Sequence, residues 1–188
     1  MPLLDTETLN QLLDFHHNSG NAATVLTTIL DDPTGYGRII RDSQGDVLGI
    51  VEQKDANSNE LAVREVNTSV YVFDAAVLSA AIANLDSNNA QHEFYLTDAL
   101  KAAKAHGRVG AFAAPDPLSV EGVNDRVQLS RLAKAYNHRI AEAWMREGVT
   151  VLDPDTTWIE DTVMIGQDAV ILPGSFLKGN TVIGAQAQ

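Results

Sequence analysis

The sequence predicts an α/β domain followed by the first coils of a left-handed parallel β-helix. Helical and strand-like patterns alternate between residues 5 and 113, which is typical of α/β folds. A long amphipathic segment follows. After it, aliphatic residues recur every six positions. This period suits neither a helix nor a flat strand, but it matches a triangular coil that turns a corner every six residues.

The α/β part opens with a helix and a buried strand. Asp5 or Thr6 can cap the helix, whose apolar side includes Leu12 and His16. Residues 22–30 are rich in β-branched side chains and in leucine. Such a run predicts a central strand that is covered on both faces.

Further elements are expected from local patterns. Residues 42–46 favour a turn, so the strands on either side should form a hairpin. The stretch 31–37 is expected to be a loop, and residues 54–60 form a polar stretch. The remaining elements, in chain order, are strands at 38–40, 47–52 and 63–73, helices at 75–85 and 95–106, and a strand at 109–113.

The most regular helix is predicted for residues 124–147, because its apolar residues are spaced at i, i+3 and i+4 and Gly148 can end it. It is expected to connect the two parts of the chain. We therefore expect three regions. Residues 1–126 form the C-terminal part of an α/β domain whose N-terminal part is missing, residues 127–148 form the connecting helix, and residues 149–188 form truncated β-helix coils.

Both ends of the chain look incomplete. A solenoid needs stacked neighbours and a polar cap, yet the repeat runs to Gln188 with neither. No Gly-rich phosphate-binding turn precedes Asp5, where a nucleotide-handling α/β domain places one. The chain is therefore expected to be a fragment. The repeat consists of Ile159, Ile165, Ile171, Leu177 and Ile183.

Composition and charge disfavour several classes of protein. The chain has 188 residues and a net charge of −12, which disfavours a nucleic-acid-binding surface because such surfaces need clustered Lys and Arg. It has no long apolar stretch, so no membrane span is expected. The absence of cysteine excludes disulfides and thiolate metal sites and suits a reducing compartment. We expect a cytoplasmic protein.

Five ordered segments carry a resemblance to a known family and together cover essentially the whole chain. The chain resembles the bacterial GlmU family of bifunctional N-acetylglucosamine-1-phosphate uridylyltransferases and glucosamine-1-phosphate acetyltransferases. The segments are residues 31–39 (DDPTGYGRI), 49–56 (GIVEQKDA), 64–68 (REVNT), 88–91 with 95–98 (NNAQ and YLTD), and 121–129 (EGVNDRVQL).

The resemblance implies a Rossmann-like nucleotidyltransferase domain that makes UDP-N-acetylglucosamine from UTP and N-acetylglucosamine 1-phosphate, for cell-wall precursor synthesis. It also implies Mg²⁺ as cofactor, acetyl-CoA as co-substrate of an acetyltransferase half, and a homotrimer. The family's catalytic loop, with its Arg and Lys, and a metal-binding Asp have no counterpart in this sequence. We therefore assign no catalytic residue, expect the chain alone to be inactive, and expect weak association of its uncapped coils.

The resemblance assigns the binding of UDP-N-acetylglucosamine to Gly37, Glu52, Asn67 and Asn124. Gly37 has no Cβ, so a sugar hydroxyl could approach its backbone N–H. The alternative is a turn that requires positive φ at Gly35 or Gly37. The Glu52 carboxylate could accept hydrogen bonds from two vicinal hydroxyls, whereas the alternative is a solvated glutamate at a strand end.

Asn67 and Asn124 complete the expected site. Asn67 offers a donor and an acceptor to an acetamido group, and asparagine is otherwise uncommon inside strands. Asn124 is also the implied Mg²⁺ ligand, since Mg²⁺ prefers hard oxygen donors, while its partner Asp is missing. From the sequence alone, Asn124 could equally serve as the N-cap of the following helix, and both roles can coexist.

Two other functions stay open at this point. The chain could belong to a nucleotidyltransferase for another sugar 1-phosphate, because fold does not determine substrate. It could also be a non-catalytic scaffold or ligand sensor, because the catalytic loop is absent. Asn67 and the segment 88–91 favour the acetamido sugar.

Overall fold

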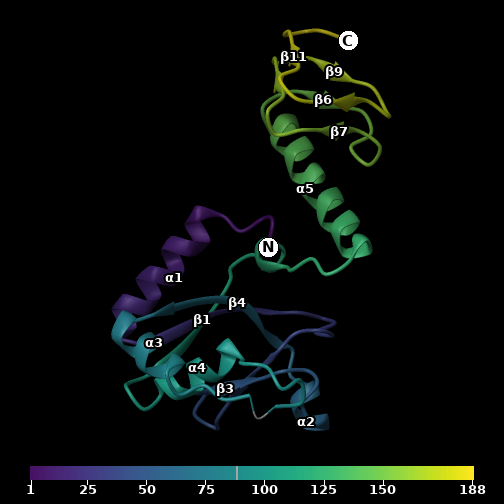
Figure 1. Cartoon of the computed structure of the whole chain (residues 1–188). Coiled ribbons are helices and arrows are strands. Elements are labelled where there is room, and N and C mark those ends of the chain that lie inside the picture. The colour runs from purple at the N-terminus through teal and green to yellow at the C-terminus, as the bar shows by residue number, and fades with distance from the viewer. Residues whose placement is uncertain (88) are drawn as a thin grey trace. The chain divides into compact units, whose positions relative to one another are not determined.

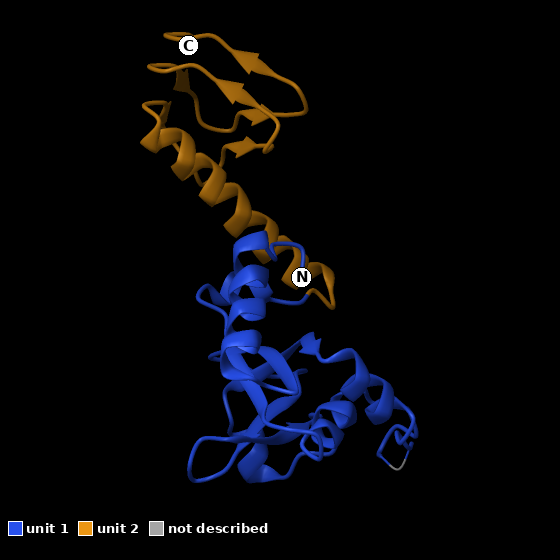
Figure 2. Ribbon diagram, turned by 90° about the vertical axis from the view of Figure 1, so that its left-hand side faces the viewer, with its two compact units in different colours: residues 1–122 blue, residues 123–188 orange. Residues whose placement is uncertain are grey.

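The structure is a computed structural model that describes residues 1–87 and 89–188 (Figure 1). The chain divides into two compact units, residues 1–122 and residues 123–188 (Figure 2). The three regions expected from the sequence stay a prediction, but the long helix belongs to the second unit rather than standing alone. Among the described residues, no helix is both long and apolar enough to cross a membrane.

The first unit is built around a mixed sheet with the strand order β3-β2-β4-β1-β5. β1 pairs antiparallel with β4 and parallel with β5, and β2 pairs antiparallel with β3. The expected hairpin and the α/β alternation are confirmed. The strands are β1 Ala23–Ile29, β2 Arg38–Arg41, β3 Val47–Val51, β4 Glu65–Phe73 and β5 Val109–Ala113.

Helical segments accompany this sheet, and the first begins where the sequence predicts. The Asp5 side chain accepts a 2.7 Å hydrogen bond from the N–H of Thr8, and the helix ends at Gly20, whose φ is 60°. The segments are α1 Thr6–Ser19, α2 Ser58–Leu61, α3 Ala75–Ile82, α4 Leu96–Ala103 and the 3₁₀ turn η1 Pro117–Val120.

The short helix α2 begins inside the polar stretch 54–60, for which the sequence predicted neither a helix nor a strand. The Asn57 side chain accepts a 3.1 Å hydrogen bond from the N–H of Glu60, and the Glu60 carboxylate accepts one of 2.8 Å from the N–H of Asn57. This reciprocal capping box stabilises a single helical turn that has no buried residue.

Strand β1 is covered on both faces, as its β-branched run predicts. Successive side chains of a strand point to opposite faces of the sheet. Val25 packs in a cluster with Leu100 of α4, whereas Leu26 packs in a separate cluster with Leu12 of α1. All four side chains are at most 1% exposed. The core of the first unit therefore has two layers, one on each side of β1.

The second unit joins α5 (Arg126–Arg146) to six two-residue strands. The strands pair in parallel: Trp158 lies opposite Phe176, and Met164 lies opposite Val182, so partners are eighteen residues apart in the chain. β6 pairs in the same sense with β9. The strands are β6 Thr150–Val151, β7 Trp158–Ile159, β8 Met164–Ile165, β9 Val170–Ile171, β10 Phe176–Leu177 and β11 Val182–Ile183.

The six-residue aliphatic repeat forms the core of this unit. Ile159, Ile165 and Ile171 are at most 6% exposed and belong to one cluster, against which Ile140 and Trp144 of α5 pack. Apolar burial is the dominant stabilising contribution in such a small core. The aliphatic spacing therefore marks the buried positions of this unit.

A buried amide attaches α5 to the strands. Asn137 is 5% exposed. Its Nδ2 donates a 2.7 Å hydrogen bond to the carbonyl of Thr157, and its Oδ1 accepts one of 2.8 Å from the N–H of Ile159. Both polar ends of the side chain are thus satisfied. α5 is an integral part of the second unit.

Candidate functional site

Three of the four residues assigned to sugar binding come together in the first unit. Gly37 directly precedes β2, Glu52 directly follows β3, and Asn67 lies in β4. The N–H of Asn67 donates a 2.9 Å hydrogen bond to the carbonyl of Gly37. A Cβ at Gly37 would lie 3.2 and 3.3 Å from the two carboxylate oxygens of Glu52. Gly37 is therefore the immediate neighbour of both Asn67 and Glu52, although the three residues are distant in sequence.

The two glycines of the loop before β2 have different roles. Gly35 adopts a φ of 89°, which favours glycine, and no atom lies within 4 Å of the place its Cβ would take. Gly37 has no positive φ but is buried, and its Cβ would lie 2.9 Å from Cγ2 of Ile50. The turn that requires a positive φ is therefore made by Gly35 and not by Gly37. Gly37 is required by close packing.

A β-bulge in β4 fixes Asn67. The register between β1 and β4 shifts between Val25 and Thr27, and Ser69 takes a φ of 64°. The Asn67 Oδ1 accepts a 2.8 Å hydrogen bond from the N–H of Ser69, which supports this conformation. Asn67 is 6% exposed, so its side chain is held in one place. This explains an asparagine in the middle of a strand.

Tyr71 lies beside Asn67 and Glu52 and was not expected from the sequence. Burial raises the pKa of its hydroxyl to about 12. A hydrogen bond with Asn67 lowers this pKa, and the negative charge of Glu52 raises it. The hydroxyl therefore stays protonated at neutral pH and can act as a hydrogen-bond donor. The alternation of residues along a strand does not distinguish a tyrosine that lines a binding site from one that packs in the core, so the sequence could not single out Tyr71.

The Glu52 carboxyl is half-buried and has unusual electrostatics. Burial raises its pKa above the ordinary value, and the nearby charges of Asp55 and Asp98 act in the same direction. A hydrogen bond with the Thr97 side chain opposes this shift. The carboxylate is therefore under-solvated and would gain from additional hydrogen-bond donors.

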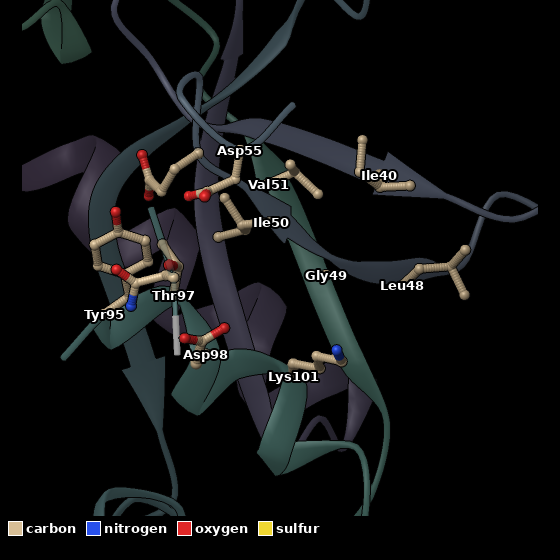
Figure 3. A pocket seen from close by; sticks show the side chains of 12 residues that line it. Ile40, Leu48, Gly49, Ile50, Val51, Asp55, Tyr95, Thr97, Asp98 and Lys101 are labelled. Carbon is tan, nitrogen blue, oxygen red and sulfur yellow. The ribbon is translucent and has the colours of Figure 1, made fainter. Parts of the chain in front are cut away.

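Glu52 is one of the residues that line a cleft of about 400 Å³. Figure 3 shows this cleft between β3 and α4. The α4 residues Thr97, Asp98 and Lys101 line one wall, and residues of β3 including Ile50 line the other. Burial raises the pKa of Asp98, an effect that the Lys101 charge opposes. Gly37 and Asn67 are not among the residues that line this cleft.

The segment 89–95 contributes Asn89 and Tyr95 to the lining of this cleft. The N–H of Ala90 donates a 3.0 Å hydrogen bond to Oδ1 of Asp55, and Nε2 of Gln91 donates one of 2.9 Å to the hydroxyl of Tyr95. Asn88, the first residue of the NNAQ segment, lies outside the described residues. The YLTD segment supplies Tyr95, Thr97 and Asp98 to the cleft. The position of this segment at the start of α4 is the sequence feature that could have predicted these three lining residues.

Asn124 lies in the second unit, and one expectation about it is wrong. The N-cap of α5 is Asp125, whose Oδ1 accepts a 2.8 Å hydrogen bond from the N–H of Gln128. The N–H of Asn124 instead donates to Oε1 of Gln128, at 2.7 Å. Asp125 and not Asn124 caps the helix, because the Asp125 side chain is one residue closer to the first helical turn. Within the described ranges, no group of three His, Cys, Asp or Glu side chains could hold a metal ion.

Comparison with known proteins agrees with the resemblance seen in the sequence. The family description "Nucleotidyl transferase" matches residues 3–145. Over 187 residues, which is all of this chain and 41% of the relative, the chain is 75% identical to the bifunctional protein GlmU of Bifidobacterium longum. The corresponding protein of Bifidobacterium adolescentis is 80% identical over 188 residues, again 41% of its length. The resemblance to GlmU proteins is confirmed.

Two more distant matches were also found. GlmU of Paenarthrobacter aurescens is 52% identical over all of this chain and 38% of the relative. A solved structure of a candidate glucose-1-phosphate thymidylyltransferase from Bacillus anthracis is 21% identical, with a TM-score of 0.48, and covers 66% of this chain and 47% of that one. This structural similarity is too low to bear on the fold. The chain spans about two fifths of the length of its curated relatives, and it belongs to the nucleotidyl transferase family.

Proposed function

We propose that this chain carries the sugar-binding part of an enzyme that makes UDP-N-acetylglucosamine from UTP and N-acetylglucosamine 1-phosphate. The observation that supports this most directly is the convergence of Gly37, Glu52 and Asn67, which three separate strands bring together. The identity of 75% to GlmU over the whole chain supports the choice of substrate.

Each of the three residues offers a contact that suits an amino sugar. The half-buried Glu52 carboxylate lacks solvation, so two vicinal sugar hydroxyls could supply the missing donors. Because Gly37 has no side chain, its main chain can lie close to this carboxylate. The Asn67 side chain and the hydroxyl of Tyr71, which form a hydrogen bond with each other, offer donors and acceptors that suit an acetamido group.

In the proposed reaction, a phosphate oxygen of N-acetylglucosamine 1-phosphate attacks the α-phosphorus of UTP, and the bond to pyrophosphate breaks. Such chemistry depends mainly on positioning the reactants and neutralising their charge, to which bound Mg²⁺ contributes. The side-chain amide oxygen of Asn124 is a donor of the kind Mg²⁺ prefers, so this residue fits the role of a single ligand. The second protein ligand would be the Asp that this sequence lacks, and substrate phosphates and water would supply the rest.

We also propose that the second unit begins a left-handed parallel β-helix. The parallel pairing of strands eighteen residues apart and the buried aliphatic repeat support this. The outward-facing positions carry Met164, Phe176 and Val182, each at least 60% exposed. This apolar surface is consistent with the homotrimer that the family resemblance implies.

A binding experiment tests the proposed substrate. We expect the chain, titrated by calorimetry with N-acetylglucosamine 1-phosphate and with glucose 1-phosphate, to bind the acetamido sugar roughly tenfold more tightly, as one well-placed hydrogen bond would produce. The variant Glu52→Gln should lose most of this affinity, whereas Glu7→Gln, an exposed change in α1, should not.

The two rival functions predict other results. Equal affinity for both sugar phosphates would favour a nucleotidyltransferase for a different sugar. Failure to bind either of them, or UDP-N-acetylglucosamine, would contradict the proposal and favour a scaffold without this ligand.

A further inference from the structure

Arg38, the first residue of β2, is a buried cation for which the described part of the chain offers no carboxylate partner. It is 2% exposed, its Nε has no hydrogen-bond partner, and no ion pair to it is found among the described residues. Hydrogen bonds from Thr34 lower the pKa of the exposed Asp32, and the charge of Arg38 lowers it further. Asp32 therefore interacts with the Arg38 charge at a distance, without a direct ion pair. By contrast, Arg41 of the same strand donates two 2.7 Å hydrogen bonds to Glu65. An unpaired buried charge destabilises a fold, so Arg38 needs another explanation.

The Arg38 guanidinium joins two segments of the chain. Its Nη1 donates to the carbonyl of Tyr36, and its Nη2 donates a 3.3 Å hydrogen bond to Oε1 of Gln53. The same Gln53 oxygen accepts a hydrogen bond from the N–H of Gly35. The planar fork of arginine suits the simultaneous holding of two acceptors, which a lysine cannot reproduce. One side chain therefore ties the loop before β2 to the end of β3.

The residues that Arg38 holds are next to the candidate sugar site. Tyr36 precedes Gly37, and Gln53 follows Glu52. A β-carbon at Gly37 would lie only 3.2 Å from the nearer Glu52 oxygen, so a shift of either segment by a few tenths of an ångström changes the space available to a sugar.

We propose that Arg38 is a positioning residue that sets the separation between Gly37 and the Glu52 carboxylate. This inference rests on the proposed function, because it assigns a task within the same site. It also explains why a residue that is unfavourable for stability occupies the start of β2: its two hydrogen bonds hold the walls of the site in place.

The test compares Arg38→Lys with Arg41→Lys, a matched change on the same strand. The reporter is the amide proton of Asn67, which donates to the Gly37 carbonyl. In Arg38→Lys we expect this proton to exchange with solvent about tenfold faster, and the Kd for N-acetylglucosamine 1-phosphate to rise about tenfold, because a charge-assisted hydrogen bond is lost. Arg41→Lys should change neither quantity.

Amide protons of β1 report global opening and separate a local effect from a general one. Equal acceleration in β1 would show a loss of overall stability and overturn the proposal, as would an unchanged Asn67 proton. If Arg38→Lys does not fold, Gln53→Leu removes the second acceptor and should also accelerate exchange at Asn67. If the wild-type chain binds no sugar phosphate, the proposed function fails, while faster exchange at Asn67 still establishes that Arg38 holds Gly37.

Discussion

The carboxylate of Glu52 lies against the space that a side chain at Gly37 would need. A Cβ there would lie 3.2 and 3.3 Å from the two Glu52 oxygens. Glycine at this position is therefore required by a neighbour in space and not by its own backbone conformation. Both residues belong to the candidate sugar site, so their contact makes the site sensitive to very small changes.

The substitution Gly37→Ala should damage the site more than the fold. The added methyl group must displace Ile50 or Glu52, and overpacking of this kind costs about 1–3 kcal/mol. We expect a modest fall in the free energy of unfolding in urea and an affinity for N-acetylglucosamine 1-phosphate that is lower by about tenfold or more. Gly184→Ala is the control, because no atom lies within 4 Å of its Cβ position. Unchanged sugar affinity in Gly37→Ala would show that Glu52 takes no part in binding.

Glu52 should make stability depend on pH in a defined direction. Its folded-state pKa is raised by burial, so the folded protein binds a proton more readily than the unfolded chain. Stability is therefore lost as pH rises from the ordinary pKa of the group, 4.5, through its raised folded value. We expect Glu52→Gln to unfold at a higher temperature than the wild type at pH 7, and the difference to vanish at a pH below 4.5. A Glu52→Gln variant that is less stable at pH 7 would contradict this.

Sugar binding should have the opposite pH dependence. The proposed contact requires the ionised carboxylate as acceptor, so affinity for N-acetylglucosamine 1-phosphate should fall as pH decreases through the raised pKa of Glu52. Calorimetric titrations at several pH values measure this. An affinity in Glu52→Gln that falls with pH as steeply as in the wild type would assign the effect to another group, such as the sugar phosphate itself.

Gly110 in β5 should be intolerant of any side chain. A Cβ there would lie 2.2 Å from Nδ2 of Asn21, which is 4% exposed and donates a 3.1 Å hydrogen bond to Thr24. Gly110→Ala must break this packing, so we expect a loss of about 1–3 kcal/mol in urea unfolding. Gly49→Ala, in β3, meets only an ordinary 4.0 Å contact with Lys101 and should be close to neutral. Similar stabilities for the two variants would refute this.

Asn137 should be essential to the second unit. Its side chain bonds both the Thr157 carbonyl and the Ile159 N–H, so Asn137→Leu leaves two buried backbone groups without partners. Each such group costs about 1–3 kcal/mol, and we expect unfolding of this unit at a clearly lower temperature. Ser130→Leu, an exposed change in the same helix, is the control. A destabilisation no larger than that of the control would argue against this anchoring role.

Local patterns were sufficient for most of the secondary structure. The strand at Ala23–Ile29 is encoded by a β-branched run, the start of α1 by Asp5, and the core of the second unit by a six-residue repeat, all within a few neighbouring residues. The exceptions also have local causes. The predicted N-cap of α5 was Asn124, whereas the observed one is Asp125. Both residue types are good caps, and the reach of the side chain decides between them.

The sequence by itself determined the α/β order, the aliphatic repeat and, through its resemblance, the residues to examine. Only the tertiary structure decided that Gly37, Glu52 and Asn67 are neighbours, and that Arg38, Tyr71 and Thr97 surround them. The physical reason is that sequence patterns report a residue's own backbone and burial. A binding site depends on the distances between side chains from different strands, and strand pairing and packing set those distances.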